Sequence, residues 1–369
     1  MKVGIICQNF PPSTFEGGIS HYSRLLAEAL CARGHNIHAL TSTEFTKDDV
    51  GREDLPPIDV IRIPGPWSWS TISNIRKVVL EKGIRALILQ YSPASFKSSF
   101  RIRWAISSFP CQKITSFHTL WGGRKHDRLA SLLMLLGCHK IIATNSEIMH
   151  LLENHLPFFL KKTYWIPIGS NIFRAECHRE KCVSPQPVIS FFGMLYPGKG
   201  LSLILDVLEE LKKRGHLFRF KFIGGGMLGL KSYEDNFRED IAARGLEDTV
   251  EHLGLLPAEE VSEWIQASRF LFLPYDSGLS DRRGSFMAAI AHGKAVLTSP
   301  PAIEMPFIKN GQNSLWPLES SVQAYSSLAQ RLLSDDELIS RLEIGATELR
   351  SYFTWEKIAA EHELVLRQE

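Results

Sequence analysis

Short β-branched runs alternate with helical patterns along most of the chain, and the alternation begins twice. The first series of strand candidates comprises residues 3–7, 37–41, 86–89, 113–117, 140–144 and 163–167. The second comprises residues 188–192, 219–223, 250–253, 270–273 and 295–299. Strands separated by helices form parallel sheets, since a parallel connection needs the long crossover that a helix supplies. The sequence therefore predicts an α/β protein of two doubly wound, Rossmann-like domains that face each other across a ligand cleft.

A polar stretch without periodicity, residues 169–187, lies between the two series and ends in Ser-Pro-Gln-Pro, as expected of a linker. We therefore expect an N-terminal domain over residues 1–175 and a C-terminal domain over residues 185–350. The length of 369 residues fits two cores, because single cores stop growing at roughly 250–300 residues. Helices are predicted from near Ser20 to Gly34 and over residues 201–214, 259–267 and 285–292, and the tail from Ser321 onward has a helical pattern throughout.

The composition and short motifs argue against a membrane-spanning, secreted or metal-binding protein. No apolar run approaches the roughly 20 residues that span a bilayer, and the run at residues 3–7 is shorter than that of a signal peptide. The six cysteines form no CxxC and no Cys/His spacing typical of a metal site. The chain also lacks a Walker-type phosphate loop and an Asp-x-Asp metal–diphosphate motif. These features predict a cytoplasmic protein with reduced thiols that needs neither a metal nor a cofactor.

The charge is unevenly distributed. Residues 1–180 carry 22 Lys and Arg against 14 Asp and Glu, whereas the remainder carries 20 against 26. The excess lies within residues 97–140, where Asp127 is the one acidic residue among Lys97, Arg101, Arg103, Lys113, Arg124, Lys125, Arg128 and Lys140. Two interpretations stay open: a surface for anionic lipid at the inner face of a membrane or for a phosphorylated acceptor, or the solvated face of ordinary amphipathic helices.

Two loops that join a strand to a helix carry glycines and charge suited to phosphate. In the first, Gly17 and Gly18 precede a helix whose free N–H groups and dipole favour an anion or a sugar hydroxyl, although a flexible turn would look the same. In the second, FFGMLYPGKG, Gly193 shapes the loop and Lys199 stands at the start of a helix. A lysine there opposes the helix dipole, so we prefer an anionic ligand to a solvated surface lysine as its explanation.

A third loop follows the apolar run FLFLP and ends at a helix of small residues. Arg282 and Arg283 precede Gly284 and Ser285, and Ser285 is the predicted N-cap of that helix. Paired guanidinium groups suit a diphosphate, because each can bind two oxygens at once. The alternative, two solvated arginines, is disfavoured because like charges at the positive end of a helix destabilise it.

His118 follows a predicted strand in the segment SFHTLWGGR. A histidine at the carboxyl end of a strand can hydrogen-bond a sugar or a transferred group. An isolated histidine is more often structural, so the position at the expected cleft is what makes His118 a candidate.

With these segments in this order, the sequence resembles the retaining GT-B glycosyltransferases of family 4 over nearly its whole length. The matching segments of the N-terminal half are the opening PP…GGI…RLLAEALCARGHNIHALTS, His118 and IPIGSNI. Those of the C-terminal half are FFGMLYPGKG, FKFIGGG, GLEDTVEHLGLLPAEEV, FLFLP, AAIAHGKAV, the segment around Glu304 and FTWEKIA. Each segment alone is a weak signal, but ten of them in the family's order indicate the GT-B fold.

The resemblance implies transfer of a sugar from a nucleotide-sugar, for which we favour a UDP-sugar, to a saccharide or lipid-linked saccharide. It implies that the N-terminal domain binds the acceptor and that the last helix, about residues 355–369, packs back on that domain. His118 would contact the donor sugar rather than act as nucleophile. It also implies that Lys199 holds the diphosphate and that residues around Gly225 and His252–Leu255 line the base. Taken together with the loops described above, the candidate catalytic residues are His118, Lys199, Arg282 and Arg283, and the candidate donor-binding residues are Gly17, Gly18, Gly193, Lys199, Gly225, Leu253, Gly284 and Ser285.

Two departures from the family pattern change the expected donor site. The family carries two glutamates eight positions apart in the third loop, and the corresponding residues here are Ser280 and Ala288. It also carries an arginine five positions before the loop lysine, where this chain has Met194. We hypothesise a relocated diphosphate clamp of Lys199 with Arg282 and Arg283, in which Ser280 or Asp281 replaces part of the lost carboxylate function toward the sugar.

Four other functions are weighed against this interpretation. The missing glutamates favour a nucleotide-sugar-binding protein without catalysis, whereas Lys199 and His118 argue for an enzyme. A sugar-nucleotide epimerase needs carboxylates in the cleft, and the loss of the two glutamates argues against it. A dehydrogenase needs a GxGxxG motif followed by an acidic residue about 20 positions on, and neither half of the chain opens with such a motif. A pI of about 8.2 without aromatic–basic motifs argues against binding to nucleic acid.

Overall fold

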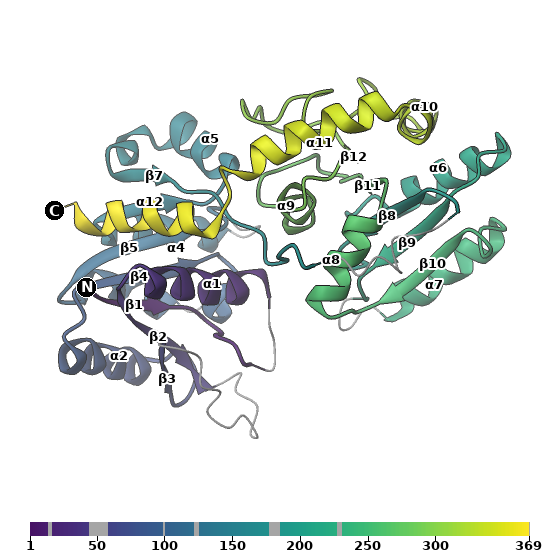
Figure 1. Cartoon of the computed structure of the whole chain (residues 1–369). Helices are drawn as coiled ribbons and strands as arrows, with labels where there is room; N and C mark the ends of the chain where they lie inside the picture. Colours follow the sequence, from purple (N-terminus) through teal and green to yellow (C-terminus); the bar gives the residue numbers. More distant parts are fainter. Residues whose placement is uncertain are drawn as a thin grey trace. The chain divides into compact units, whose positions relative to one another are not determined.

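The computed structural model describes residues 1–13, 17–43, 58–98, 100–121, 125–176, 185–226 and 231–368. The chain divides into two compact units, the first made of Met1–Asn171 with Trp355–Glu369 and the second of Ile172–Thr354. Each unit contains one parallel sheet with helices around it (Figure 1). The chain leaves the first unit after Asn171 and returns to it at Trp355, so the last helix belongs to the N-terminal unit.

The first unit is built on seven parallel strands in the order β3-β2-β1-β4-β5-β6-β7. These are β1 (Lys2–Ile6), β2 (Asn36–Ser42), β3 (Asp59–Ile63), β4 (Ala86–Tyr91), β5 (Gln112–Phe117), β6 (Lys140–Ala143) and β7 (Thr163–Trp165). The order reverses between β1 and β4, because β1 pairs with β2 on one side and β4 on the other. Doubly wound sheets bind ligands outside the carboxyl ends of the strands at such a point.

Helices cover both faces of this sheet. They are α1 (Gly18–Ala32), α2 (Trp69–Lys82), α3 (Phe100–Ala105), α4 (Lys125–Gly137), α5 (Ser146–His155) and α12 (Trp355–Arg367), with short 3-10 helices η2 (Ser95–Ser98), η3 (Ile106–Ser108) and η4 (Pro157–Lys162). Successive strand residues point to opposite faces, so Val3 and Ile5 pack under α1 and α12 while Ile6 packs with α2 to α5. The alternation of side chains therefore supplies two apolar cores, one on each face.

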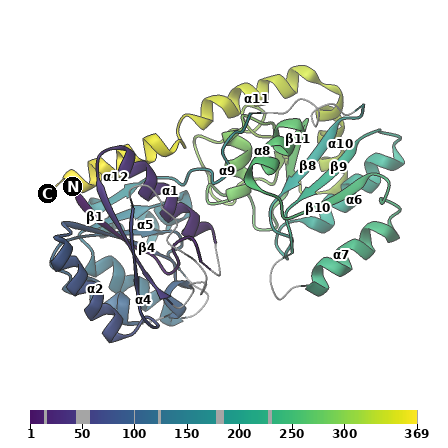
Figure 2. The same cartoon turned by 60° about the horizontal axis from the view of Figure 1, so that its bottom comes forward.

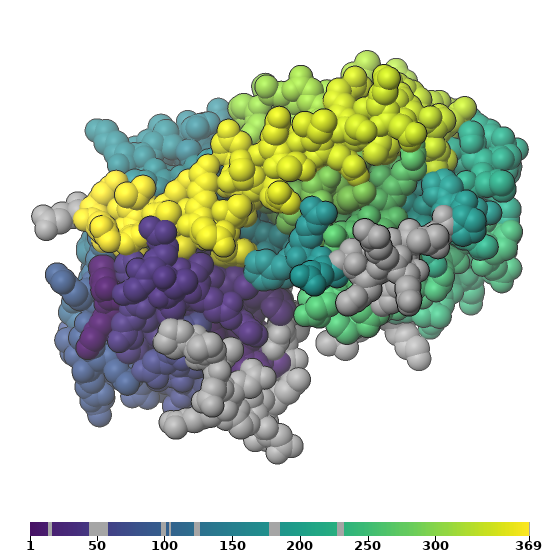
Figure 3. All heavy atoms as spheres, viewed as in Figure 1, coloured from purple at the N-terminus to yellow at the C-terminus, as the bar shows by residue number. Residues whose placement is uncertain are grey.

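The last helix, α12, packs against α1 from the opposite end of the sequence (Figures 1 and 3). The indole N–H of Trp355 donates to the carbonyl oxygen of Ser170 at 2.8 Å, and its ring lies 5.2 Å from the ring of Tyr22. The Nδ1 of His362 donates to the carbonyl oxygen of Ile358 at 2.8 Å, so its Nε2 accepts from the hydroxyl of Tyr22 at 3.4 Å. These buried contacts attach α12 to the N-terminal unit.

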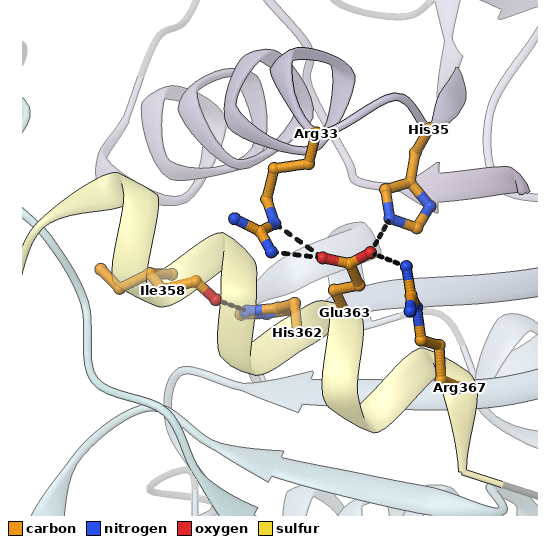
Figure 4. Close-up of polar contacts among 6 residues, drawn as sticks. All are labelled: Arg33, His35, Ile358, His362, Glu363 and Arg367. Atoms are coloured by element: carbon orange, nitrogen blue, oxygen red, sulfur yellow. Dashed lines mark hydrogen bonds and ion pairs between the residues drawn. The ribbon is translucent and has the colours of Figure 1, made fainter.

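One carboxylate fixes the far end of α12 (Figure 4). Glu363 is 7% exposed and accepts a hydrogen bond of 2.8 Å from the Nε of Arg33, which ends α1. Its other oxygen lies 3.5 Å from the Nε2 of His35 and also bonds Arg367, one turn later in α12. The hydrogen bond from Arg33, helped by the charge of Arg367, holds the pKa of Glu363 below its ordinary value.

The second unit is built on five parallel strands in the order β10-β9-β8-β11-β12 (Figure 2). The strands are β8 (Val188–Phe192), β9 (Arg219–Ile223), β10 (Val250–Gly254), β11 (Phe270–Leu273) and β12 (Val296–Thr298). The helices are α6 (Leu201–Lys213), α7 (Lys231–Ala243), α8 (Ala258–Ala267), α9 (Gly284–Ala291), α10 (Val322–Ser334) and α11 (Asp336–Arg350). The central strands β8 and β11 are neighbours, and the strand order reverses between them.

The structure corrects two expectations about the elements. The edge strand β3 was not predicted, because Asp59 and Arg62 interrupt its apolar residues. The tail from Ser321 onward is not helical throughout, since it breaks twice. The carboxylate of Asp335 caps α11 by accepting from the N–H of Leu338 at 2.9 Å, and residues 351–354 separate α11 from α12.

Replacing Glu363 by glutamine is expected to lower the melting temperature of the chain at pH 7, since the neutral amide cannot pair with Arg33. The pKa of Glu363 is depressed, so its contribution to the free energy of unfolding is present above the ordinary carboxyl pKa and is lost as the pH falls through the lower folded value. The difference between wild type and Glu363→Gln should therefore shrink in acid. Melting curves from pH 7 to pH 3.5 test this, with Glu81→Gln, from the exposed pair with Lys77, as control. A difference that does not change with pH would contradict the role of the charge.

Candidate functional site

Two loops of the second unit meet at the carboxyl edge of its sheet. One follows β8 and carries Gly193 and Lys199, and the other follows β11 and runs over residues 274–283. The carboxyl ends of neighbouring parallel strands lie at the same edge, which brings the two loops together. Gly200, at φ +65°, lies against Pro274, and a Cβ at Gly200 would collide with the carbonyl oxygen of Pro274. The glycine therefore allows the close approach of the two loops.

Tyr275, directly after Pro274, joins the two loops through its ring. The Nζ of Lys199 lies 5.7 Å from the ring centroid, and the Cζ of Arg283 lies 4.8 Å from it. Both distances are within the range of cation–π attraction. Lys199 also lies 5.0 Å from the ring of Tyr196 in its own loop. Sequence analysis did not single out Tyr275, although an aromatic residue at the end of an apolar strand and beside a cationic loop is a usable signal.

Lys199 and Arg283 carry like charges close together. Burial, and next the charge of Arg283, lower the pKa of Lys199 to about 8. The Nη2 of Arg283 donates to the Oγ of Ser277 at 2.6 Å, while its buried Nε has no hydrogen-bond partner among the described residues. Within the described ranges neither cation forms an ion pair with a carboxylate. The pair therefore keeps an excess of positive charge that suits an anion with several oxygens.

The predicted N-cap role of Ser285 is wrong. α9 begins at Gly284, and Arg283 occupies the N-cap position without a capping side chain. Ser285 thus lies inside the first turn, where its backbone is already helical and its hydroxyl cannot cap the N–H groups that follow. The Oγ of Ser285 instead lies 2.7 Å from the hydroxyl of Tyr275.

The two arginines of the third loop differ in their surroundings. Arg283 is half-buried against Tyr275, whereas the side chain of Arg282 is exposed. Ser280 and Asp281 are 4% and 1% exposed, so little of either faces solvent. The structure therefore brings Arg283 to Lys199, while a role of Arg282, Ser280 or Asp281 toward a donor stays a prediction.

The segments predicted to line the base come together at the ends of β9 and β10. The N–H of Gly224 donates to the last residue of β10 at 2.9 Å, and the Nε2 of His252 donates to the carbonyl oxygen of Gly224 at 2.8 Å. A Cβ at Gly225 would collide with the side chain of Leu255, and Leu253 is half-buried beside them. Contact with a base stays a prediction for these residues.

In the first unit, Gly17 and Gly18 form the start of α1. Gly17 is the N-cap residue and provides no side-chain cap, so the first N–H groups of the helix depend on other partners. A Cβ at Gly18 would meet no atom of the described residues within 4 Å. Residues 14–16 of the same loop lie outside the described residues.

His118 lies at the carboxyl end of β5. Its Nε2 is 2.8 Å from the Oε1 of the fully buried Gln90, its ring meets the ring of Tyr22 edge-on at 4.9 Å, and the Nδ2 of Asn145 donates to its carbonyl oxygen at 3.2 Å. Burial, and next the charge of His362, lower the pKa of His118 to about 3. The imidazole is thus neutral at pH 7 and can offer hydrogen bonds but no charge. Gln90 was not among the candidates predicted from the sequence, although a polar residue within an apolar strand is a signal that could have identified it.

The predicted basic surface is only partly present. Lys113 and Lys140 are 9% and 6% exposed, and their ammonium groups donate to the carbonyl oxygens of Ser107 at 3.1 Å and Val365 at 2.6 Å. Both lysines therefore support the fold and do not contribute to a surface. Arg101 and Arg128 are exposed, Arg124 lies outside the described residues, and the side chains of Lys97, Arg103 and Lys125 are also not described.

Four leucines form a stripe along part of the exposed side of α4. Leu129 is 53% and Leu136 65% exposed, and the half-buried Leu132 and Leu133 lie between them at helical spacing. Arg128 is exposed on the same helix, and α3, which carries Arg101, packs beside it. We call these four leucines the α4 leucine stripe.

Metal and membrane features were searched in the described part of the chain. No three side chains of His, Cys, Asp or Glu there are grouped so that they could hold a metal ion. No helix of that part has the length and hydropathy needed to cross a bilayer. Cys7, Cys31, Cys111 and Cys138 are free cysteines.

Comparison with known proteins shows what the chain resembles. Residues 16–172 match the model for Glycosyltransferase Family 4, and residues 176–348 match the model for Glycosyl transferases group 1. The chain is 25% identical over 300 residues to the "Putative colanic acid biosynthesis glycosyltransferase WcaL" of Escherichia coli (strain K12), an alignment that covers 73% of this chain and 70% of that protein.

Solved structures share the fold over the whole chain. Sucrose-phosphate synthase from Thermosynechococcus elongatus has a TM-score of 0.78 at 19% identity, covering 100% of this chain and 98% of that one. HepE from Anabaena, solved in complex with UDP and glucose, has a TM-score of 0.75 at 16% identity, covering 99% of both chains. The two parallel sheets described above have the GT-B architecture of these proteins.

Replacing Lys199 by methionine is expected to raise the melting temperature of the second unit. The folded pKa of about 8 lies below the ordinary lysine value of 10.5, so protonated Lys199 destabilises the fold fully below pH 8, by about 3 kcal/mol at most. This destabilisation decreases as the pH rises from 8 toward 10.5. In that range Lys199 is neutral in the folded chain but still protonated in the unfolded chain, so the free energy of unfolding rises with pH. Scanning calorimetry at pH 7 and pH 10 checks both parts, with Lys294→Met as control. Lys294 pairs with Glu343 at 2.5 Å, so its loss should lower the melting temperature. A lower melting temperature for Lys199→Met would contradict the buried-charge argument.

Proposed function

We propose that this chain, a glycosyltransferase of the GT-B fold, moves a sugar from a nucleoside diphosphate donor to a saccharide or lipid-linked saccharide acceptor. One observation carries the donor site: Lys199 and Arg283 meet on Tyr275 without a carboxylate partner in the described part of the chain. A diphosphate would supply the missing negative charge, and a guanidinium can bind two of its oxygens. Gly200, the N-cap residue of α6, adds no capping side chain, so the N-terminus of α6 remains available to phosphate.

We favour a UDP-sugar as donor. The Anabaena protein of the same fold is described in complex with UDP and glucose, and with UDP-glucose, which supports this choice. The Escherichia coli relative is named for the biosynthesis of colanic acid, which supports an acceptor on the route to a polysaccharide.

We infer a metal-independent transfer with retention of the anomeric configuration. When the bond between the anomeric carbon and the phosphate oxygen breaks, its electron pair goes to the diphosphate. Lys199 and Arg283 stabilise that growing charge because they are already in place. The acceptor hydroxyl forms the new bond on the same face of the sugar, and its proton passes to an oxygen of the leaving diphosphate. Neutral His118 would contribute hydrogen bonds to the sugar.

A nucleotide-sugar-binding protein without catalysis is the second candidate. Ser280 and Ala288 stand where the family carries its two glutamates, and Ala288, 1% exposed, cannot bind the ribose hydroxyls. Both candidates bind the donor, but only the enzyme releases the nucleoside diphosphate faster when an acceptor is added. Measuring UDP release with and without saccharide acceptors therefore separates them.

We further propose that the first unit docks on an anionic membrane surface through the α4 leucine stripe. A helix with leucines on its exposed face and cations beside them binds the interface between headgroups and acyl chains. Arg128 on α4 and Arg101 on α3 are the exposed cations that support this choice. Such docking would bring a lipid-linked acceptor to the enzyme and place it at the inner face of the membrane, in the cytoplasm.

Replacing Arg283 by alanine is expected to weaken UDP binding by about tenfold or more, since a hydrogen-bonded charge partner of the diphosphate is lost. Arg282→Ala should have a smaller effect because its side chain is exposed. Arg269→Ala is the control, because Arg269 pairs with Asp336 at 2.6 Å. A thermal-shift panel of UDP-, GDP-, ADP- and dTDP-sugars first identifies the donor, and calorimetric titration then compares the three variants. Equal and negligible effects of all three would contradict the clamp.

Replacing both Leu129 and Leu136 by glutamine is expected to reduce binding to anionic phospholipid vesicles by about tenfold, since two exposed leucines would no longer enter the interface. Co-sedimentation with anionic and with zwitterionic vesicles measures the bound fraction. Leu80→Gln is the matched control, because Leu80 is 61% exposed on α2, outside the stripe. Unchanged binding of the double variant would exclude the stripe as the docking surface.

A further inference from the structure

We propose that Tyr275 is a positioning residue that holds both cations of the diphosphate clamp on the face of its ring. This inference rests on the proposed function, because it states how the donor phosphates are gripped. The two cations come from different loops: Lys199 lies between β8 and α6, and Arg283 lies at the start of α9. The ring of Tyr275 is near both, at 5.7 Å from the Lys199 Nζ and 4.8 Å from the Arg283 Cζ.

The ring of Tyr275 is fixed before any ligand arrives. The side chain is 2% exposed, its hydroxyl lies 2.7 Å from the Oγ of Ser285, and its backbone N–H donates to the Oγ of Ser299 at 2.8 Å. One end of the residue is thus attached to α9 and the other to the end of β12. A ring held at both ends presents a constant surface to the two cations.

An aromatic ring suits this place better than a carboxylate. A carboxylate between Lys199 and Arg283 would neutralise them and compete with the phosphates of the ligand. The face of a tyrosine ring attracts a cation through its quadrupole and adds no net charge. Tyr275 therefore offsets the repulsion between the two cations and leaves their charge available to the diphosphate.

Tyr196 does not have the same position. Its ring lies 5.0 Å from the Nζ of Lys199, but it belongs to the same loop as that lysine and is half-buried. Arg283 has its ring contact with Tyr275. Tyr275 is consequently the ring that sets the distance between the two cations. A diphosphate can bind both cations at once only if that distance matches the spacing of its oxygens.

Binding of UDP and of inorganic pyrophosphate to the full chain tests the proposal. Tyr275→Phe keeps the ring and should bind both within about threefold of wild type. Tyr275→Leu removes the ring and should lose about tenfold or more for both. Phe237→Leu is the matched control, since Phe237 is a buried aromatic residue of the same unit, packed on Phe222 at 4.8 Å, and its loss should leave binding unchanged. Wild-type affinity in Tyr275→Leu, or an equal loss in Tyr275→Phe, overturns the proposal.

A double variant separates positioning from general support of the fold. If Tyr275 acts through the cations, Tyr275→Leu loses less affinity in a chain that already carries Arg283→Ala than it does in wild type. Fully additive losses overturn the role. Where Tyr275→Leu fails to fold, NMR of wild type labelled at its lysines replaces the binding test. The signal of the Lys199 ε-protons is assigned by its loss in Lys199→Arg. The nearby aromatic rings should shift this signal upfield, and the shift should change in Tyr275→Met. Ordinary lysine shifts overturn the proposal.

The outcomes for the two proposals are distinct. Wild type that binds pyrophosphate with the expected dependence on Tyr275, but binds no nucleoside diphosphate, contradicts the proposed function and supports the clamp. Wild type that binds UDP with no dependence on Tyr275 supports the function and overturns the clamp.

Discussion

Parallel pairing of β8 with β11 is the constraint on which the candidate donor site depends. The two strands are far apart in the sequence but adjacent in the sheet, so their carboxyl ends present the loops with Lys199 and Arg283 to each other. Gly200 lets the loops touch, because a side chain there would collide with Pro274. The strand order reverses at the same place, which is where doubly wound sheets bind ligands. Sheet topology thus decides which cations can act together.

The same arrangement makes the second unit less stable than it could be. Burial and like charge depress the pKa of Lys199, which means that the folded protein holds this proton less firmly than the unfolded chain does. Function and stability often conflict in this way at binding sites. The ring of Tyr275 reduces the conflict without cancelling the charge, since a cation is attracted to a π face that carries no net charge. A bound diphosphate would remove the remaining repulsion.

In the first unit, one residue connects the candidate sugar contact to the last helix of the chain. Tyr22 of α1 touches the ring of His118 and bonds His362 of α12, so it links the histidine predicted from the sequence to that helix. Lys140 donates to the carbonyl oxygen of Val365 near the end of α12, where a cation is favourable. The basic residues of segment 97–140 therefore have different roles. Lys140 holds α12, whereas Arg101 and Arg128 are exposed.

The sequence by itself determined the α/β class, the two parallel sheets, most strands to within two residues, the glycines and lysine of the loop after β8, and the arginine pair of the loop after β11. Strand periodicity, glycine and helix-start patterns are local, so they can be detected without the fold. Only the tertiary structure decided that Arg283 and Lys199 contact the same ring, that Ser285 bonds Tyr275 instead of capping α9, and that Lys113 and Lys140 are buried. Each of these depends on a neighbour from a distant segment, and the pairing of strands and the packing of helices set such neighbours. The sequence shows which residues are charged, but the pairing of the strands decides which of those charges lie close together.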